Sequence, residues 1–169
     1  MAEIIKAYKQ PVPAMRFIGK KYANGNAWGE WHEKGWFGEI EKAAGGAEAV
    51  HKLYEDGGAY IGLFRLDKNY DLAEYWIGVF VPPGTEAPSG FQSIDYSARD
   101  LGVCWIYGAN LNDILSLVWV TDDRIKDEGM EIIFEEDGSL WCIERYCCPR
   151  YTTPDEKGKI IMDCCYFVK

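Results

Sequence analysis

The segment WCIERYCC, residues 141–148, places one carboxylate, that of Glu144, among aromatic residues, cysteines, an isoleucine and one arginine. A carboxylate inside such a strand costs several kcal/mol unless it is paired, hydrated or uncharged. Glu144 must therefore face a positive partner, open water, or a cavity in which a ligand or a proton completes the charge. In an apolar cavity, such a group can hold a cation or act as a general acid or base.

Side chains alternate across a β-strand, and this separates the segment into two faces. Cys142, Glu144, Tyr146 and Cys148 share one face, so Arg145 points away from Glu144 and cannot neutralise it directly. A carboxylate beside a phenol suits a pocket that binds cations or handles protons, and these two side chains are our candidates for catalytic and ligand-binding residues. A glutamate on an edge strand that simply reaches water is the alternative that the pattern leaves open.

Two further segments are strands interrupted by glycine. In AYIGLF, Gly62 shares a face with Tyr60, and in EYWIGVF, Gly78 shares a face with Trp76. Glycine within a strand often marks room for a ligand, and also a bulge or a barrel corner. The two glycines support a cavity lined by Tyr60 and Trp76, and a purely structural role for each glycine remains open.

The sequence lacks the motifs of metal sites, of nucleotide cofactors and of serine nucleophiles. The six cysteines contain no C-x-x-C spacing and two pairs are adjacent in sequence, which is a poor start for a zinc site, so we expect no metal and reduced, buried thiols. The chain has neither a G-x-G-x-x-G motif nor a P-loop nor a G-x-S-x-G elbow, so we expect no cofactor. Its two histidines, His32 and His51, offer little choice of general base, although a Cys-His nucleophile at Cys104 or Cys142 stays a remote alternative.

Composition narrows the class of protein. The 169 residues fit a single domain, 1–169, and 15% of them are aromatic, an excess that favours a ligand cavity. The formal net charge is −9 without any basic run, which disfavours direct binding to nucleic acid. Neither a secretory signal nor an apolar run long enough for a membrane helix is present in the sequence, so we expect a cytoplasmic protein.

The predicted elements alternate between strands and helices. Strands are expected over 13–23, 59–67, 72–84 and 160–169, and 90–108 reads as one long strand or two short ones. Helices are expected over 28–46, 47–58 and 110–120, and 130–148 reads as a hairpin closed by Asp137-Gly138. Strand, helix and two strands occur twice in this order, which predicts an α+β fold with an antiparallel sheet and a topological duplication.

The order of these motifs resembles the GyrI-like small-molecule-binding domain, which also serves as the effector-binding domain of multidrug-responsive bacterial transcription activators. The resemblance is carried by PAMRFIGKKY, AYIGLFRLD, EYWIGVFVPPG, IDYSARDLG, CIERY and DCCYFVK, and it covers residues 13–169. It implies duplicated βαββ units whose antiparallel sheets curve around a central ligand groove flanked by two helices. The chain departs from the family in ending on Tyr166-Phe167-Val168-Lys169 instead of Pro-Val-Lys, and no helix-turn-helix precedes the domain, so we expect a stand-alone form.

The resemblance also implies pocket positions. Glu144 corresponds to the acidic residue at the pocket floor, and the neighbouring position is Tyr146. The remaining implied positions are aromatic: Tyr60 on the second strand, Trp28 or Trp31 at the start of the first helix, and Trp105 or Tyr107 near the second helix.

Three functions follow from these observations. The first is a stand-alone binder of hydrophobic, often cationic aromatic compounds such as drugs or other xenobiotics. The second, from stand-alone relatives in the resembled family, is a hydrolase that opens strained cyclopropanoid natural products, with Glu144 activating water and Tyr146 assisting. The third is a protein-interaction module, for which the sequence shows no carboxylate stripe. Binder and hydrolase require the same pocket, and the sequence favours the binder.

Overall fold

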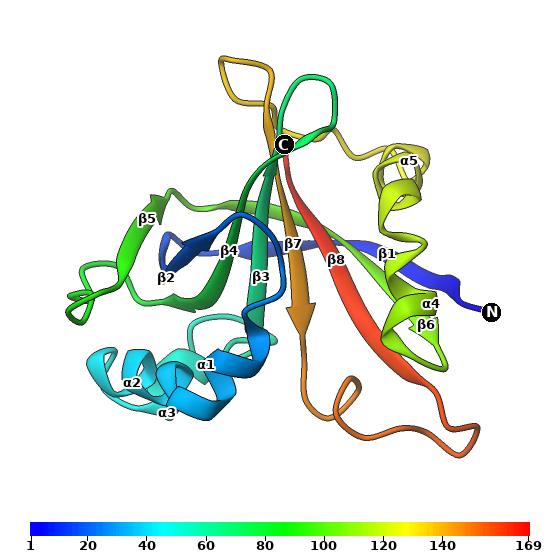
Figure 1. Ribbon diagram of the computed structural model, residues 1–169. Coiled ribbons are helices and arrows are strands. Elements are labelled where there is room, and N and C mark those ends of the chain that lie inside the picture. The colour runs from blue at the N-terminus through cyan, green and yellow to red at the C-terminus, as the bar shows by residue number, and fades with distance from the viewer.

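The computed structural model describes all residues 1–169 and has an α+β fold, with a curved sheet and short helices (Figure 1). The strands are β1 (Glu3–Val12), β2 (Met15–Tyr22), β3 (Tyr60–Leu66), β4 (Leu72–Val81), β5 (Gln92–Tyr96), β6 (Arg99–Gly108), β7 (Leu140–Tyr146) and β8 (Ile160–Val168). The helices are α1 (Trp28–Lys34), α2 (Trp36–Ala43), α3 (Ala47–His51), α4 (Leu111–Leu115), the 3-10 turn η1 (Val118–Val120) and α5 (Thr121–Asp127). None of the helices is long and apolar enough to span a membrane.

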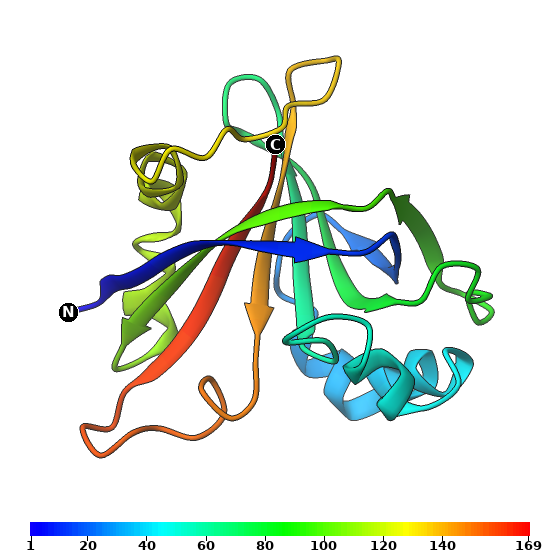
Figure 2. The same ribbon diagram turned by 180° about the vertical axis from the view of Figure 1, so that it is seen from behind.

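The strands form one eight-stranded sheet in the order β1-β6-β8-β7-β3-β4-β2-β5, with antiparallel neighbours throughout. The centre of the sheet lies between β3 and β7. Counted outward from there, the strands on one side are β3, β4 and β2, and the strands at the equivalent positions on the other side are β7, β8 and β6. The two views show β1 and β6 crossing behind the central pair, β3 and β7, as seen in Figure 1 (Figures 1 and 2). β7 is therefore a central strand, and the alternative of Glu144 on an edge strand is excluded.

Both faces of the central strands carry buried hydrophobic side chains. One hydrophobic core lies between the sheet and the helices of both halves, and it contains Trp31, Ile40 and Ile125 from the helices. A second core lies on the opposite face, where Phe17 and Phe80 pack together among residues of the curving outer strands. Burial on both faces explains why five of the seven residues of β7 are apolar or aromatic, as is usual for strands buried on both faces.

The helices are shorter than the sequence predicted. The expected helix over 28–46 is divided at Gly35, which has a φ of +67° and ends α1 just before α2 begins. This left-handed conformation is favourable for glycine and terminates many helices. The predicted helix over 47–58 ends at His51, and that over 110–120 is divided into α4 and η1.

The predicted hairpin over 130–148 is wrong. A turn does form, with the Glu135 amide donating to the Ser139 carbonyl at 2.7 Å, but 130–134 does not pair with β7. Both edges of β7 are occupied, by β3 and β8, so the preceding segment contacts the end of β8 instead, where the Ile133 amide donates to the Phe167 carbonyl. The sequence reading also missed β1, which pairs with β6 at one edge of the sheet.

Candidate functional site

The backbone of the central strands creates the space around Glu144. Glu144 on β7 lies directly opposite Gly62 on β3, and Tyr60 lies opposite Tyr146 one step further along the same face. A Cβ atom on Gly62 would lie 2.7 Å from Oε2 of Glu144 and 2.7 Å from the hydroxyl oxygen of Tyr75. No side chain larger than hydrogen fits there without displacing these groups, so Gly62 provides the room for the carboxylate.

Four side chains form what we call the Glu144 cluster: Glu144, Tyr75, Tyr146 and Trp28. The hydroxyls of Tyr75 and Tyr146 both donate to Oε2 of Glu144, at 3.1 and 2.9 Å, and Trp28 Nε1 donates to the Tyr75 hydroxyl at 3.0 Å. Glu144 is only 8% exposed. Its second oxygen, Oε1, has no hydrogen-bond donor within the protein.

No cationic side chain pairs with Glu144. Arg145 points to the other face, where it binds Asp163, as strand alternation predicted. Burial raises the pKa of Glu144, and the two phenol hydrogen bonds offset only part of that rise. Burial, reinforced by the nearby carboxylate, also raises the pKa of Tyr75 and of Tyr146, so both phenols remain protonated donors. The cluster is therefore a buried carboxylate without a counter-charge.

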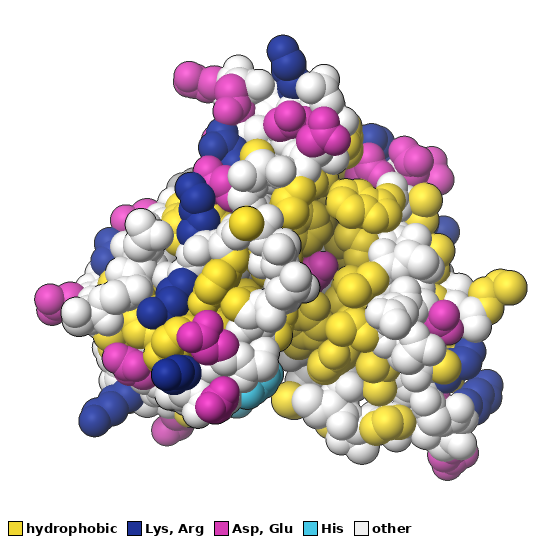
Figure 3. All heavy atoms as spheres, in the orientation of Figure 1, with side chains coloured by type: hydrophobic (Ala, Val, Ile, Leu, Met, Phe, Trp, Pro, Cys, Tyr) yellow, Lys and Arg dark blue, Asp and Glu magenta, His cyan; other side chains and the backbone are white.

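Two cavities adjoin the cluster. The smaller, about 220 Å³, has Glu144 and Tyr75 in its wall, together with apolar side chains that include Phe64 and the exposed Trp119. The larger, about 700 Å³, is lined by Tyr60, Trp28, Tyr146 and Tyr151 among others, and Gly25 borders both cavities. Figure 3 shows an apolar hollow in the middle of this face of the molecule, with an acidic side chain at its bottom.

The structure brings together Glu144, Tyr146, Tyr60 and Trp28 out of the eight predicted site residues. Tyr146 packs edge-on against Trp28 with ring centroids 4.9 Å apart. Tyr60 stacks on Phe37 with centroids 3.7 Å apart, so helix α2 supports this wall of the larger cavity. Trp28, Tyr60 and Tyr146 line the larger cavity, and Glu144 lines the smaller one.

The other four predicted residues lie elsewhere and are corrections to the sequence reading. Trp31 is fully buried beneath α1, where its Nε1 donates to Tyr22. Trp76 packs on the opposite face of the sheet, against Phe17. Two more belong to β6, outside both cavities: Trp105 packs edge-on against Tyr8, and the Tyr107 hydroxyl donates to Asp155 at 2.6 Å.

Tyr75 is the cluster residue that the sequence reading missed. The hairpin register pairs Phe64 with Tyr75, and Leu63 with Trp76, so Tyr75 faces Glu144 and Trp76 does not. The choice of Trp76 assumed that the two glycines of β3 and β4 share a face, but Gly78 pairs with Ile61. A signal for Tyr75 was nevertheless present, since it is the aromatic residue immediately before Trp76.

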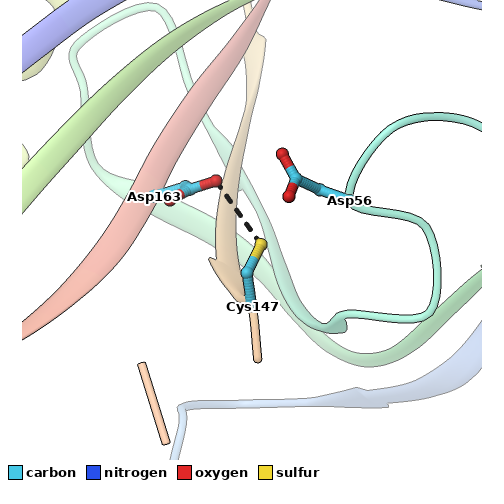
Figure 4. A group of neighbouring side chains, drawn as sticks. All are labelled: Asp56, Cys147 and Asp163. Carbon is cyan, nitrogen blue, oxygen red and sulfur yellow. Dashed lines mark hydrogen bonds between the residues drawn. The ribbon is translucent and has the colours of Figure 1, made fainter. Parts of the chain in front are cut away.

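A second polar cluster lies behind the site and contains Asp56, Cys147 and Asp163 (Figure 4). Their donor atoms lie within 4.8 Å of one another, a spacing that a metal ion could use. The carboxylates are already neutralised, because Arg145 and Arg150 each form ion pairs with both of them. Burial raises the pKa of the Cys147 thiol, which favours the neutral form over the thiolate that metals bind. We assign this network a structural role, joining β7, β8 and the two loops behind the larger cavity.

No family model and no curated protein matches this sequence, but solved structures share its fold. A protein from Staphylococcus aureus MU50, described as a candidate bacterial transcription regulation protein, superposes with a TM-score of 0.60 at 15% identity, covering 97% of this chain and 98% of its own. SAV2435 bound to tetraphenylphosphonium gives 0.55 at 16% identity, covering 98% and 94%. A hydrolase encoded by lin2189 from Listeria innocua gives 0.53 at 14% identity, covering 97% and 92%. At these identities the similarity shows the fold alone.

Proposed function

We propose that this protein binds hydrophobic, often cationic aromatic small molecules in the hollow at Glu144, as a member of the GyrI-like small-molecule-binding domains. The observation that carries the proposal is the buried carboxylate, whose hydrogen-bond partners are two neutral phenols. A ligand cation supplies the charge that the protein itself does not. Aromatic walls complete such a site, because their faces attract cations and their area binds apolar groups.

The solved structure with tetraphenylphosphonium supports the ligand class, since that compound is a hydrophobic aromatic cation bound by a protein of the same fold. The matched strand order supports a duplication: β2 with β3 and β4 would form one βαββ unit, and β6 with β7 and β8 the other. In that arrangement the groove lies over the boundary of the two units, where β3 contacts β7, and the helices of each unit form its two sides.

The test is a fluorescence titration of the protein and of Glu144→Gln with a panel of cationic dyes and uncharged dyes of similar shape. We expect the variant to lose affinity for the cations and to keep its affinity for the neutral dyes. Equal losses in the two groups would remove Glu144 from the role of counter-charge.

A second candidate function is hydrolysis of strained cyclopropanoid compounds. It is favoured by the Tyr146–Glu144 hydrogen bond and by the fold shared with a hydrolase of Listeria innocua. Glu144 would take a proton from the water whose oxygen forms the new C–O bond, and Tyr146 would orient that water. The electron pair of the broken C–C bond would be protonated from solvent. A cyclopropanoid compound that is consumed no faster with the protein than without it, by liquid chromatography, would exclude this function.

A further inference from the structure

The larger cavity contains a carboxylate of its own. Glu41 on α2 lies one helical turn after Phe37, and its side chain lines the cavity without any hydrogen bond or ion pair. Asp56 in the same cavity is already paired with two arginines. Glu41 is therefore the carboxylate of the larger cavity that remains free for a ligand.

The surroundings of Glu41 resemble those of Glu144 in kind. Aromatic side chains form the nearby wall, where Phe37 and Tyr60 stack in parallel, 4° from coplanar. Partial burial raises the pKa of Glu41, and the charge of Glu41 contributes to the raised pKa of Tyr60, which lines the same cavity. The imidazole of His51 also lines this cavity and acts on Glu41 in the opposite sense.

The two carboxylates line different cavities. Tyr60 and Tyr146 form one register pair and Gly62 and Glu144 the next on the same face, a step of two residues, or roughly 7 Å. Glu41 lines the larger cavity and Glu144 the smaller, and Gly25 borders both. A single small cation held in one cavity does not meet the carboxylate of the other, whereas an elongated molecule that extends from one cavity into the other can meet both.

We propose that the larger cavity is a second cation-binding subsite with Glu41 as its carboxylate, so that the protein takes elongated ligands carrying a positive group at each end. This inference rests on the proposed function, because the first positive group occupies the site at Glu144. It adds a ligand class, dications with an apolar spacer, and a residue that selects them.

The test compares decamethonium, a dication with a long apolar spacer, with decyltrimethylammonium, which has the same chain and a single charge. Affinities are measured by isothermal titration calorimetry in one mildly alkaline buffer. The variants are Glu41→Gln and the matched control Glu39→Gln, which changes an exposed glutamate on the same helix. Thermal melts establish that both variants fold.

We expect decamethonium to bind the wild type about fivefold more tightly than decyltrimethylammonium, a gain of the size that a partly exposed ion pair supplies. Glu41→Gln should remove this preference and leave the affinity for decyltrimethylammonium unchanged, and Glu39→Gln should keep it. An equal affinity of the wild type for the two ligands, or a preference that survives Glu41→Gln, would overturn the proposal. Failure of the underlying function has a different signature, in which Glu144→Gln leaves the affinity for decyltrimethylammonium unchanged.

Discussion

Replacing Glu144 by glutamine should stabilise the free protein at neutral pH. Both phenols, Tyr75 and Tyr146, donate to the same oxygen, Oε2, so the amide oxygen of a glutamine can accept both hydrogen bonds. The amide nitrogen then replaces Oε1, which has no donor within the protein. The substitution therefore removes the buried charge and leaves the volume and the hydrogen-bond pattern in place.

The size of the effect follows from two opposing contributions. Removing a carboxylate from water costs several kcal/mol, and each hydrogen bond to a charged acceptor offsets about 1.5–3 kcal/mol of that cost. Hydrogen bonds to the neutral amide return roughly half as much, without the cost of burying a charge. We expect the variant to be more stable by about 1–2 kcal/mol, which for a chain of this length raises Tm by about 3–6 °C.

The stabilisation should depend on pH with a definite sign. The pKa of Glu144 is higher in the folded protein than in the unfolded chain, so the folded state binds the proton more tightly. The wild type loses stability as pH rises from the ordinary glutamate value of about 4.3 through the raised native pKa, and the variant does not. The stability difference should be smallest at acidic pH, below the ordinary glutamate pKa, and should grow as pH rises toward the raised native pKa.

Urea unfolding followed by tryptophan fluorescence, without ligand, measures this difference from acidic to neutral pH. Glu136→Gln is the control, because Glu136 is exposed and its replacement should leave stability unchanged at every pH. A Glu144→Gln variant that is less stable than the wild type at neutral pH would refute the reasoning, because it would mean that the folded protein favours the ionised carboxylate.

Three further substitutions test the surroundings of the site. Tyr146→Phe removes one donor to Glu144, so the pKa of the carboxyl should rise further and the pH at which cations begin to bind, followed by titration, should rise with it; an unchanged pH profile would contradict this. Gly62→Ala should destabilise the protein by about 1–3 kcal/mol in urea unfolding and weaken cation binding, because its Cβ would lie 2.7 Å from the carboxylate oxygen of Glu144. A variant with the stability and the cation affinity of the wild type would show that the space at Gly62 is not limiting. Asp163→Asn should cost about 3–5 kcal/mol, because it leaves Arg145 buried beside fewer charges, and a loss below about 1 kcal/mol would show that the network is dispensable.

Strand alternation was sufficient to predict which side chains of β7 lie together in the candidate site. It placed Glu144 with Tyr146 and separated both from Arg145, because the side-chain period of a strand does not depend on what surrounds it. It could not identify Tyr75, because the face of a residue on β4 relative to β3 depends on the hairpin register, and a shift of one residue exchanges the faces. The error that chose Trp76 is an error of this kind.

Long-range pairing limited the prediction of the fold. The turn at Asp137-Gly138 was recognisable, but local sequence does not reveal that β3 and β8 already occupy both edges of β7. Similarly, Trp31 and Trp28 stand on the same helix three residues apart, and packing decides that Trp31 enters the core while Trp28 reaches the carboxylate through Tyr75. The helix periodicity alone does not separate these two roles.

The most direct test of a counter-charge at Glu144 compares two ligands of one shape, phenyltrimethylammonium and its uncharged isostere tert-butylbenzene. Two unit charges about 5 Å apart at an effective dielectric constant near 20 attract by about 3 kcal/mol. The hydrogen bonds from Tyr75 and Tyr146 already stabilise part of the negative charge of Glu144. We therefore expect about 2 kcal/mol of this attraction to contribute to binding, which is roughly a thirtyfold selectivity for the cation. We predict that Glu144→Gln abolishes this selectivity by weakening the binding of the cation alone. An equal preference for the cation in the wild type and in Glu144→Gln would contradict it.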